Sequence, residues 1–445
     1  MQKDTIQLSD HFNYRRLLRF TFPSIIMMIF TSIYGVVDGI FISNYAGATP
    51  FAAVNLIMPF LMIFSAIGFM IGTGGSALVS MTFGMGDSKR ANAIFSLLTY
   101  FVIGCGIFFS VLSELILPLV ARMMGASGEM YNYCIQYGRI IILSLTAFML
   151  QNMMSSFLVV AEKPKLGLMI TVAAGLTNMV LDAFFVGLLG WGVRGAALAT
   201  VCTECTGGLL PLIYFILPNS SILHLGSPCR ELAPLIKAST NGASEFLTNV
   251  SMSLVNMIYN LQLMRLAGEQ GVAAYGIIMY ASFIFCAIFI GYSMGSAPIV
   301  GYHYGAGNHQ EMSGVFRKSM VLMTIFQLAM TICGIGFAGP IARIFVGYDA
   351  GLLAMTTTAF ALYCTRFIIS GYNIYASSFF TALNNGLVSG IISFSRVLLF
   401  QIAAVLILPI FLGLTGIWIS MTVSEFLSLL VSAYFFLHCR ARYHY

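Results

Sequence analysis

The chain has 445 residues, of which 59% are hydrophobic and 8% charged, and its formal net charge is +6. A soluble domain normally carries about 25% charged residues, so this composition excludes a soluble globular protein and indicates one that lies in lipid. Basic loops beside an anionic leaflet account for the net charge, and no nucleic-acid partner is expected.

Twelve apolar runs follow one another along the chain, and each reaches the roughly 20 residues that cross a bilayer as a helix. The predicted fold class is therefore an all-α integral membrane protein. The N-terminal 19 residues are polar and basic with no small-residue cleavage site after them, so we expect the N-terminus to be retained. The predicted span limits are 18–43, 51–80, 94–120, 136–160, 167–189, 195–217, 236–264, 272–300, 317–339, 352–380, 388–410 and 414–437.

The basic residues of the connecting loops predict the orientation. Counted alternately from the N-terminus, one set of connections holds fourteen Lys and Arg residues, whereas the other holds only Arg122, Arg194, Arg265 and Arg343. Cytoplasmic loops carry the excess of positive charge. We therefore predict a multi-pass protein of the plasma (inner) membrane with both termini in the cytoplasm and an even number of helices.

The chain resembles itself when it is shifted by 221 residues, the separation of Glu204 and Glu425. "FGMGDSKRANAIF", which begins at Phe83, then falls on "YGAGNHQEMSGVF", which begins at Tyr304. Each half holds six predicted spans, and an even number makes both halves enter from the same side of the membrane. Such halves are parallel repeats related by an axis along the membrane normal.

The repeat predicts the domain organisation. We expect an N-terminal six-helix lobe at 1–217, a cytoplasmic linker at 218–235 and a C-terminal six-helix lobe at 236–445. Two lobes around a central cleft suit transport by alternating access better than a channel, which is more simply built from identical subunits around a pore.

Two aspartates stand at similar depth in the first lobe. Asp38 lies 19 residues beyond Arg19 and Asp182 lies 17 beyond Lys165, which at about 1.5 Å per residue places both in the outer half of the lobe. Asn178 precedes Asp182 by one turn and shares its helix face. Ionisable groups in hydrocarbon are costly and mark pathways. Two carboxylates and an amide oxygen predict a site for H⁺ or Na⁺, the alternative being separate acids that stabilise helix packing.

Pro23 and Tyr34 belong to the same predicted helix as Asp38. Pro23 removes a backbone hydrogen bond and predicts a bend, and Tyr34 lies one turn before Asp38, within its reach. We expect the bend to couple protonation of Asp38 to the shape of the lobe, the alternative being an ordinary proline kink.

The later spans hold further ionisable residues. Glu204 and Glu425 occupy equivalent positions in the two repeats, which favours a shared packing or gating role. Glu245 lies beside a polar cluster, and Arg366 and Arg396 are arginines of the second lobe. Glu245, Arg366, Glu204 and Glu425 are the candidate contacts for substrate or for a cation in the second lobe.

Together these features resemble the MATE (multidrug and toxin extrusion) family. The resemblance rests on "VDGIFISNYAGATPFAAVNLIMPF", "FGMGDSKRAN", "AEKPKLG", "TNMVLDAFF" and "GVRGAALAT", which occur in this order over nearly the whole chain. It implies twelve transmembrane helices in a V-shaped pair of six-helix bundles, and export of amphipathic or cationic drugs and toxins in exchange for H⁺ or Na⁺. We expect no bound cofactor and no enzymatic activity, and a monomer whose partners are small-molecule substrates and membrane lipid.

The resemblance also implies roles for individual residues. Members with an acidic first-lobe site place its groups on the first, fourth and fifth helices. In this chain the first helix contributes Asp38, and the fifth contributes Asn178 and Asp182. On the fourth helix Asn152 is favoured and Ser155 is the alternative. The family's bending proline corresponds to Pro23.

The same resemblance predicts where coupling does not occur. Some members pair a seventh-helix Glu with a tenth-helix Asp in a second cation site; Glu245 fits the first role, but the tenth span carries Arg366 and no acid. Coupling is therefore expected to rest on the first lobe.

Two other functions are open. A flippase for a lipid-linked precursor would need a basic groove for a pyrophosphate, for which only Arg366 and Arg396 are candidates. An intramembrane enzyme would need clustered catalytic acids, histidines or a metal motif near one surface, and the sequence contains no such cluster.

Overall fold

The computed structural model describes residues 6–347 and 349–445. Of the fourteen predicted cytoplasmic cations, Lys3 lies outside this range. The N-terminal half contains α1 (Tyr14–Phe41), η1 (Ile42–Ala46), α2 (Ala48–Gly84), α3 (Ser88–Met123), α4 (Gly128–Val160), α5 (Pro164–Asp182), η2 (Ala183–Leu188) and α6 (Gly192–Ile216), where η marks a π-helical segment.

The C-terminal half begins with a very long helix and contains several interruptions. Its elements are α7 (Ala233–Gly305), α8 (His309–Gly336), α9 (Ala338–Val346), α10 (Ala350–Cys364), α11 (Phe367–Ala382), α12 (Gly386–Phe394), η3 (Ser395–Phe400) and α13 (Gln401–Tyr443).

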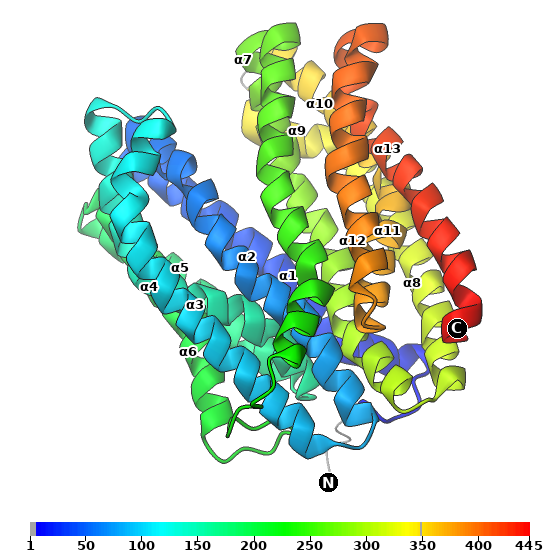
Figure 1. Cartoon of the computed structure of the whole chain (residues 1–445). Helices are drawn as coiled ribbons and strands as arrows, with labels where there is room; N and C mark the ends of the chain where they lie inside the picture. The colour runs from blue at the N-terminus through cyan, green and yellow to red at the C-terminus, as the bar shows by residue number, and fades with distance from the viewer. Residues whose placement is uncertain (1–5, 348) are drawn as a thin grey trace.

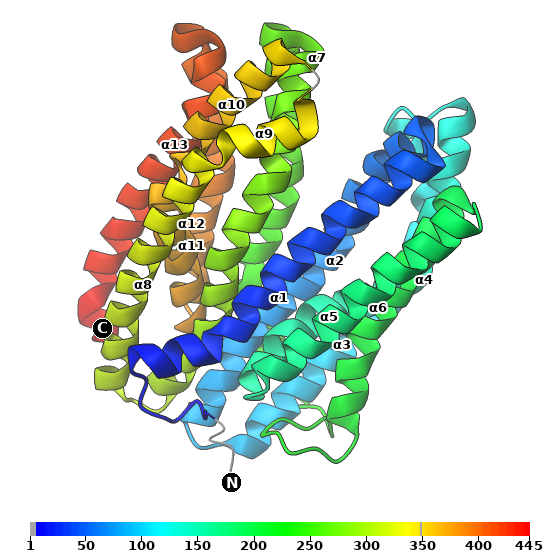
Figure 2. The same ribbon diagram turned by 180° about the vertical axis from the view of Figure 1, so that it is seen from behind.

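The helices form two bundles arranged as a V. Figure 1 shows α1–α6 in one arm and α7–α13 in the other, with the arms meeting at the lower end and separating toward the upper end. The reverse view in Figure 2 shows α1 and α2 between the rest of their own bundle and α7. The described N-terminal segment, from Ile6, and the C-terminus lie toward the end where the arms meet, which carries the loops predicted to be cytoplasmic.

The helix count agrees with the twelve predicted crossings. Within the described ranges nine helices are long and apolar enough to span a membrane, and α10 with α11 forms a further span bent by 47°. Two of the nine are double, because the chain turns at Gly268 (φ 62°) in α7 and at Gly413 (φ 56°) in α13. Only glycine adopts such a positive φ without a Cβ clash, so these two glycines make the turns that the predicted span limits placed there.

The predicted repeat appears in the contacts between the arms. A Cβ on Gly74 of α2 would lie 2.9 Å from the Cα of Gly242 in α7, and a Cβ on Gly295 of α7 would lie 3.0 Å from the Cα of Thr21 in α1. Gly74 corresponds to Gly295, and Thr21 to Gly242, at the same offset of 221 residues. The arms therefore meet through two pseudo-symmetric backbone contacts, α2 with α7 and α1 with α7. The domain boundaries themselves remain predictions.

The helix start signals follow the repeat as well. Asp87 caps α3 by accepting the backbone N–H of Arg90, and its counterpart Asn308 caps α8 in the same way through Glu311. An N-cap of this kind contributes about 1 kcal/mol to helix stability. The Gly-rich segment around Asp87 is thus a tight turn into a helix.

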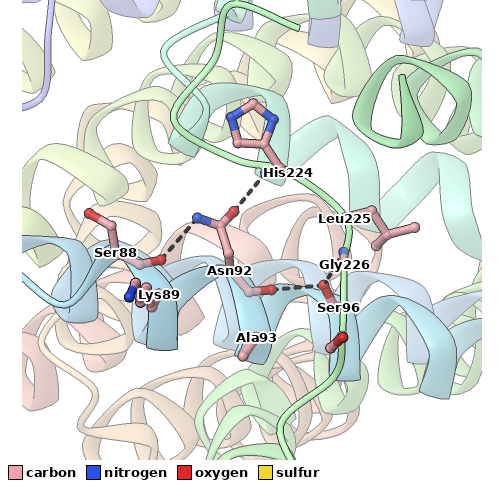
Figure 3. A pocket seen from close by; sticks show the side chains of 9 residues that line it. Ser88, Lys89, Asn92, Ala93, Ser96, His224, Leu225 and Gly226 are labelled. Carbon is pink, nitrogen blue, oxygen red and sulfur yellow. Dashed lines mark hydrogen bonds between the residues drawn. The ribbon is translucent and has the colours of Figure 1, made fainter. Parts of the chain in front are cut away.

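The predicted linker at 218–235 lies along α3 of the first arm. Figure 3 shows Asn92 and Ser96 of α3 beside this segment. The side-chain oxygen of Asn92 accepts the backbone N–H of His224 at 2.6 Å, and the hydroxyl of Ser96 accepts that of Gly226 at 2.9 Å. These bonds hold the middle of the linker against α3 of the first arm.

Candidate cation-coupling site

Close packing of α1 on α5 brings the two predicted aspartates together. Figure 2 shows these helices adjacent. A Cβ on Gly175 of α5 would lie 2.9 Å from the ring of Tyr34 in α1, so only glycine permits this approach. Asp38 follows Tyr34 by one turn, Asp182 follows Gly175 by two, and the side chains of Asp38 and Asp182 lie close enough to interact directly.

The carboxylate oxygens of Asp38 and Asp182 have few hydrogen-bond donors around them. Asp182 has no exposed surface, and in the described part of the chain neither of its carboxylate oxygens accepts a hydrogen bond. The same holds for Oδ1 of Asp38 and for the amide oxygen of Asn178, which is 2% exposed. Two adjacent carboxylates, one buried and one half-buried, repel one another and lack hydrogen-bonded compensation among the described residues, which favours a shared proton or a bound cation.

The two fourth-helix candidates differ in their hydrogen bonds. Asn152 is buried on α4 and its amide nitrogen has no partner among the described residues, whereas the hydroxyl of Ser155 donates to the backbone carbonyl of Asn152 at 2.8 Å. Asn152 thus retains an unused donor, and Ser155 does not contribute its hydroxyl hydrogen. No hydrogen bond joins either side chain to Asp38 or Asp182 in the described residues.

Three polar residues near the aspartates were missed by sequence reasoning. Tyr137 of α4 is completely buried, close to the Asp38 and Asp182 carboxylates, and its hydroxyl interacts with Thr200 of α6. Gln151 of α4 interacts with the hydroxyl of Tyr34. Polar tips within apolar runs are the signal that could have indicated these residues, but helix periodicity alone does not reveal which run faces which.

Pro23 lies where α1 crosses onto the second arm. It is buried inside α1, which stays helical from Tyr14 to Phe41. Beside it, the backbone of Ser24 and Ile25 lies so close to Gly291 of α7 that a Cβ there would be 2.6 Å from the Cα of Ile25. The bending role of Pro23 remains a prediction, and its position connects any bend to the contact between the arms.

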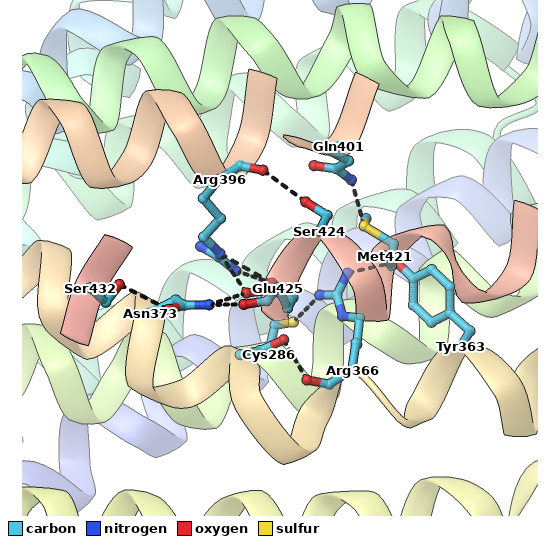
Figure 4. A network of polar contacts seen from close by, with 11 residues as sticks. Cys286, Tyr363, Arg366, Asn373, Arg396, Gln401, Met421, Ser424, Glu425 and Ser432 are labelled. Carbon is cyan, nitrogen blue, oxygen red and sulfur yellow. Dashed lines mark hydrogen bonds and ion pairs between the residues drawn. The ribbon is translucent and has the colours of Figure 1, made fainter. Parts of the chain in front are cut away.

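The second lobe holds an ion-pair network (Figure 4). Arg396 donates to both carboxylate oxygens of Glu425, from Nε at 3.1 and 3.0 Å and from Nη2 at 2.8 Å. Asn373 adds a bond to the same carboxylate at 2.8 Å. Glu425 is 3% exposed, so its charge is compensated inside the lobe.

Arg366 and Glu245 lie near this network. Arg366 occupies the break between α10 and α11 and donates to the hydroxyl of Tyr363 and the sulfur of Cys286, both at 2.8 Å. Glu245 of α7 is half-buried and within electrostatic range of Arg396. The predicted contacts of Glu245 and Arg366 with substrate remain predictions.

Glu204 differs from its counterpart Glu425. It is 5% exposed, and its carboxylate accepts a short hydrogen bond from the hydroxyl of Ser144. No ion pair reaches it within the described ranges. The two repeat-related acids therefore have different electrostatic surroundings, and their predicted common role stays untested.

All three π-helical segments of the described residues adjoin charged side chains of the two lobes. η1 follows Asp38 by one turn, η2 begins directly after Asp182, and η3 contains Arg396. Such segments are rare and occur frequently at functional sites.

A twelve-span helical protein with an internal repeat, a V-shaped arrangement and buried acids in one lobe is a membrane transporter by architecture. The MatE family model matches residues 23–184 and 246–407, one match in each half. The chain therefore belongs to the MatE family and is a multi-pass membrane transporter, not an enzyme.

Named relatives and solved structures agree with this assignment. The chain is 23% identical to multidrug export protein MepA of Staphylococcus haemolyticus over 93% of its length and 90% of that protein, and 22% identical to MepA of Staphylococcus aureus strain MRSA252 over 94% and 92%. It matches a crystal structure of MATE in complex with MaL6, with a TM-score of 0.92 at 22% identity over 100% of this chain and 99% of that one. An outward-facing multidrug resistance MATE family transporter of the MOP superfamily matches with the same TM-score, identity and coverage. These likenesses confirm the fold.

Proposed function

We propose that this protein exports amphipathic, often cationic drugs and toxins by alternating access, in exchange for H⁺ or Na⁺. The observation that carries the proposal is the proximity of the buried Asp182 carboxylate to the half-buried Asp38 carboxylate. Among the described residues no donor reaches either oxygen of Asp182 or Oδ1 of Asp38. A cation or proton entering from outside neutralises the pair, and the first lobe then changes shape and releases the drug. The named relatives are multidrug export proteins, which supports the substrate class.

The coupling ion binds in this proposal to Asp38, Asp182 and the amide oxygen of Asn178. Among the described residues no group of three His, Cys, Asp or Glu side chains is placed to hold a metal ion. A bound Na⁺ would depend on the amide oxygen as well as on the carboxylates, since hard cations prefer oxygen ligands. A proton would need only the two carboxylates.

The remaining features follow from the same proposal. We place the protein as a monomer in the plasma (inner) membrane with both termini in the cytoplasm, so that the V opens outward. The flippase alternative receives no specific support, because Arg396 is bonded to Glu425, and Arg366 to Tyr363 and Cys286.

Reconstituted protein tests the proposal. Proteoliposomes loaded with a fluorescent cationic dye are given an imposed pH gradient and, separately, an imposed Na⁺ gradient. Dye movement driven by one gradient identifies the coupling ion. Absence of movement with either gradient, in vesicles that retain folded protein, would refute cation-coupled export.

A further inference from the structure

The two lobes repeat one another in fold but not in buried charge. At the 221-residue offset Asp38 corresponds to Tyr259 and Arg396 to Gly175. The first lobe thus contains Asp38, Asp182 and Glu204 in its interior, while Glu425 of the second lobe has Arg396 beside it. Of these three acids, Glu204 is not part of the proposed coupling site.

No cation of the described residues is placed to neutralise Glu204. The segments α2, η1 and η2, which pack against α6, contain no charged residue at all. The cations of α4, α5 and α6 are Arg139, Lys165 and Arg194, and all three are exposed. Arg139 is bonded to Glu114 at 2.8 Å, and Arg194 to Gln136 at 3.2 Å.

The groups that do surround Glu204 are neutral or acidic. Ser144 of α4 donates its hydroxyl, and the hydroxyls of Tyr34 and Tyr137 and the thiol of Cys205 lie within electrostatic range. An ionised carboxylate buried among such groups is costly, because one neutral hydrogen bond does not replace its hydration. A bound proton removes this cost.

We propose that Glu204 is a second proton-binding site of the first lobe, separate from the Asp38–Asp182 pair. Tyr34 and Tyr137 are each close to both Glu204 and Asp38, so the two sites share neighbours that can transmit a change in protonation. On the proposed antiport function, Glu204 then exchanges a proton in addition to the ion, H⁺ or Na⁺, that the aspartate pair exchanges for each exported molecule. This inference rests on that function only for the exchange, because proton occupancy of Glu204 is measurable without transport.

Infrared difference spectroscopy on the full-length protein tests the occupancy directly. At neutral pH without substrate, the spectrum of the wild type should contain the carbonyl stretch of a protonated carboxylic acid that is missing in Glu204→Gln. The matched control Glu114→Gln removes an exposed acid bonded to Arg139 and should leave that band unchanged. An equal band in the wild type and in Glu204→Gln, with both proteins eluting as a single species, would overturn the proposal.

Proton counting tests the link to transport. In weakly buffered detergent solution with a pH indicator, saturating tetraphenylphosphonium should release about one proton fewer from Glu204→Gln than from the wild type, because a neutral amide has no proton to exchange. Ser144→Ala keeps the acid while removing its hydrogen bond, so it should move the release to higher pH and provides a test if Glu204→Gln folds poorly. Equal release by the wild type and Glu204→Gln, including no release by either, would contradict only this inference. Failure of both imposed gradients to move dye would contradict the proposed function.

Discussion

Single side chains show why the first lobe is the candidate for coupling. Asp38 and Asp182 lie together on α1 and α5, and no donor among the described residues reaches Asp182, whereas Glu425 has both Arg396 and Asn373. A compensated acid does not need a mobile ion, because its charge is already neutralised. An uncompensated pair of carboxylates in a low dielectric needs a mobile ion to neutralise its charge.

Replacing Asp38 with asparagine tests the pair. Asp38→Asn should abolish dye export while leaving membrane insertion intact, because the neutral amide preserves size but can neither release a proton nor bind a cation by charge. The measurement is drug resistance of cells, paired with the amount of protein in the membrane. Glu114→Gln serves as the control, and unchanged resistance with Asp38→Asn would refute the role of the pair.

The second lobe's ion pair yields a stability prediction. Arg396→Gln leaves the buried carboxylate of Glu425 without its counter-ion, which should cost about 3–5 kcal/mol. The double variant Arg396→Met with Glu425→Met should recover most of that loss, because no unpaired charge remains. Thermal unfolding in detergent provides the measurement.

An exposed pair is the control for this comparison. Arg90 and Glu231 lie 3.4 Å apart with side chains 56% and 65% exposed, so Glu231→Gln should change stability by less than about 1 kcal/mol. Equal losses from Glu231→Gln and Arg396→Gln would show that burial does not determine the effect.

At the scale of elements, glycines decide how closely the arms approach. A Cβ on Gly242 of α7 would lie 1.9 Å from the carbonyl oxygen of Met70 in α2, and one on Gly84 of α2 would lie 2.0 Å from that of Tyr302 in α7. Because these contacts involve backbone atoms, no side-chain rotation relieves them. The α2–α7 contact is therefore specified by the absence of side chains.

Adding one methyl group tests this contact. Gly242→Ala should destabilise the protein by about 1–3 kcal/mol, the usual cost of overpacking. Gly276→Ala lies in the same long helix with no atom within 4 Å of the added Cβ, so alanine's higher helix propensity should leave stability unchanged or raise it by up to about 1 kcal/mol. The melting temperature of Gly242→Ala should therefore be clearly lower than that of Gly276→Ala. Equal losses of stability in the two variants would contradict the proposed role of the glycine in the α2–α7 contact.

Across the whole molecule, the segment before α1 connects the arms at the end where they meet. The backbone N–H of Leu8 donates to Glu162, in the turn between α4 and α5, at 2.7 Å, and that of Phe12 donates to Glu311, at the start of α8, at 2.8 Å. Leu8 and Phe12 have no exposed surface. Glu162 holds a positive φ of 60°, a conformation unfavourable for a residue with a Cβ. Separating the arms at this end requires one of these attachments to break.

Removing the carboxylate of Glu162 should favour that separation. Glu162→Ala deletes one hydrogen bond, a change of about 1 kcal/mol or roughly fivefold in population. Spin labels at Lys165→Cys in the first arm and Arg317→Cys in the second, after replacement of the nine native cysteines, should report more molecules with long separations. Glu231→Ala, in the linker, should leave the distances unchanged, and the same result from Glu162→Ala would contradict the prediction.

Much of this protein could be predicted from its sequence, because the relevant signals are local or repeat along the chain. Apolar run length indicates the twelve crossings, since a helix crosses lipid only where an apolar run reaches about 20 residues. The offset between Glu204 and Glu425 indicates the two lobes, and the depths of Asp38 and Asp182 indicate that the two acids can meet. The tertiary structure alone shows that Arg396 neutralises Glu425 while no cation of the part of the chain that the structure describes reaches Glu204. It alone also shows that η1, η2 and η3 interrupt the helices at charged positions and that Glu162 and Glu311 hold the same N-terminal segment. These features depend on which helix faces pack together and where the helical period breaks, and neither is encoded within a single run of residues.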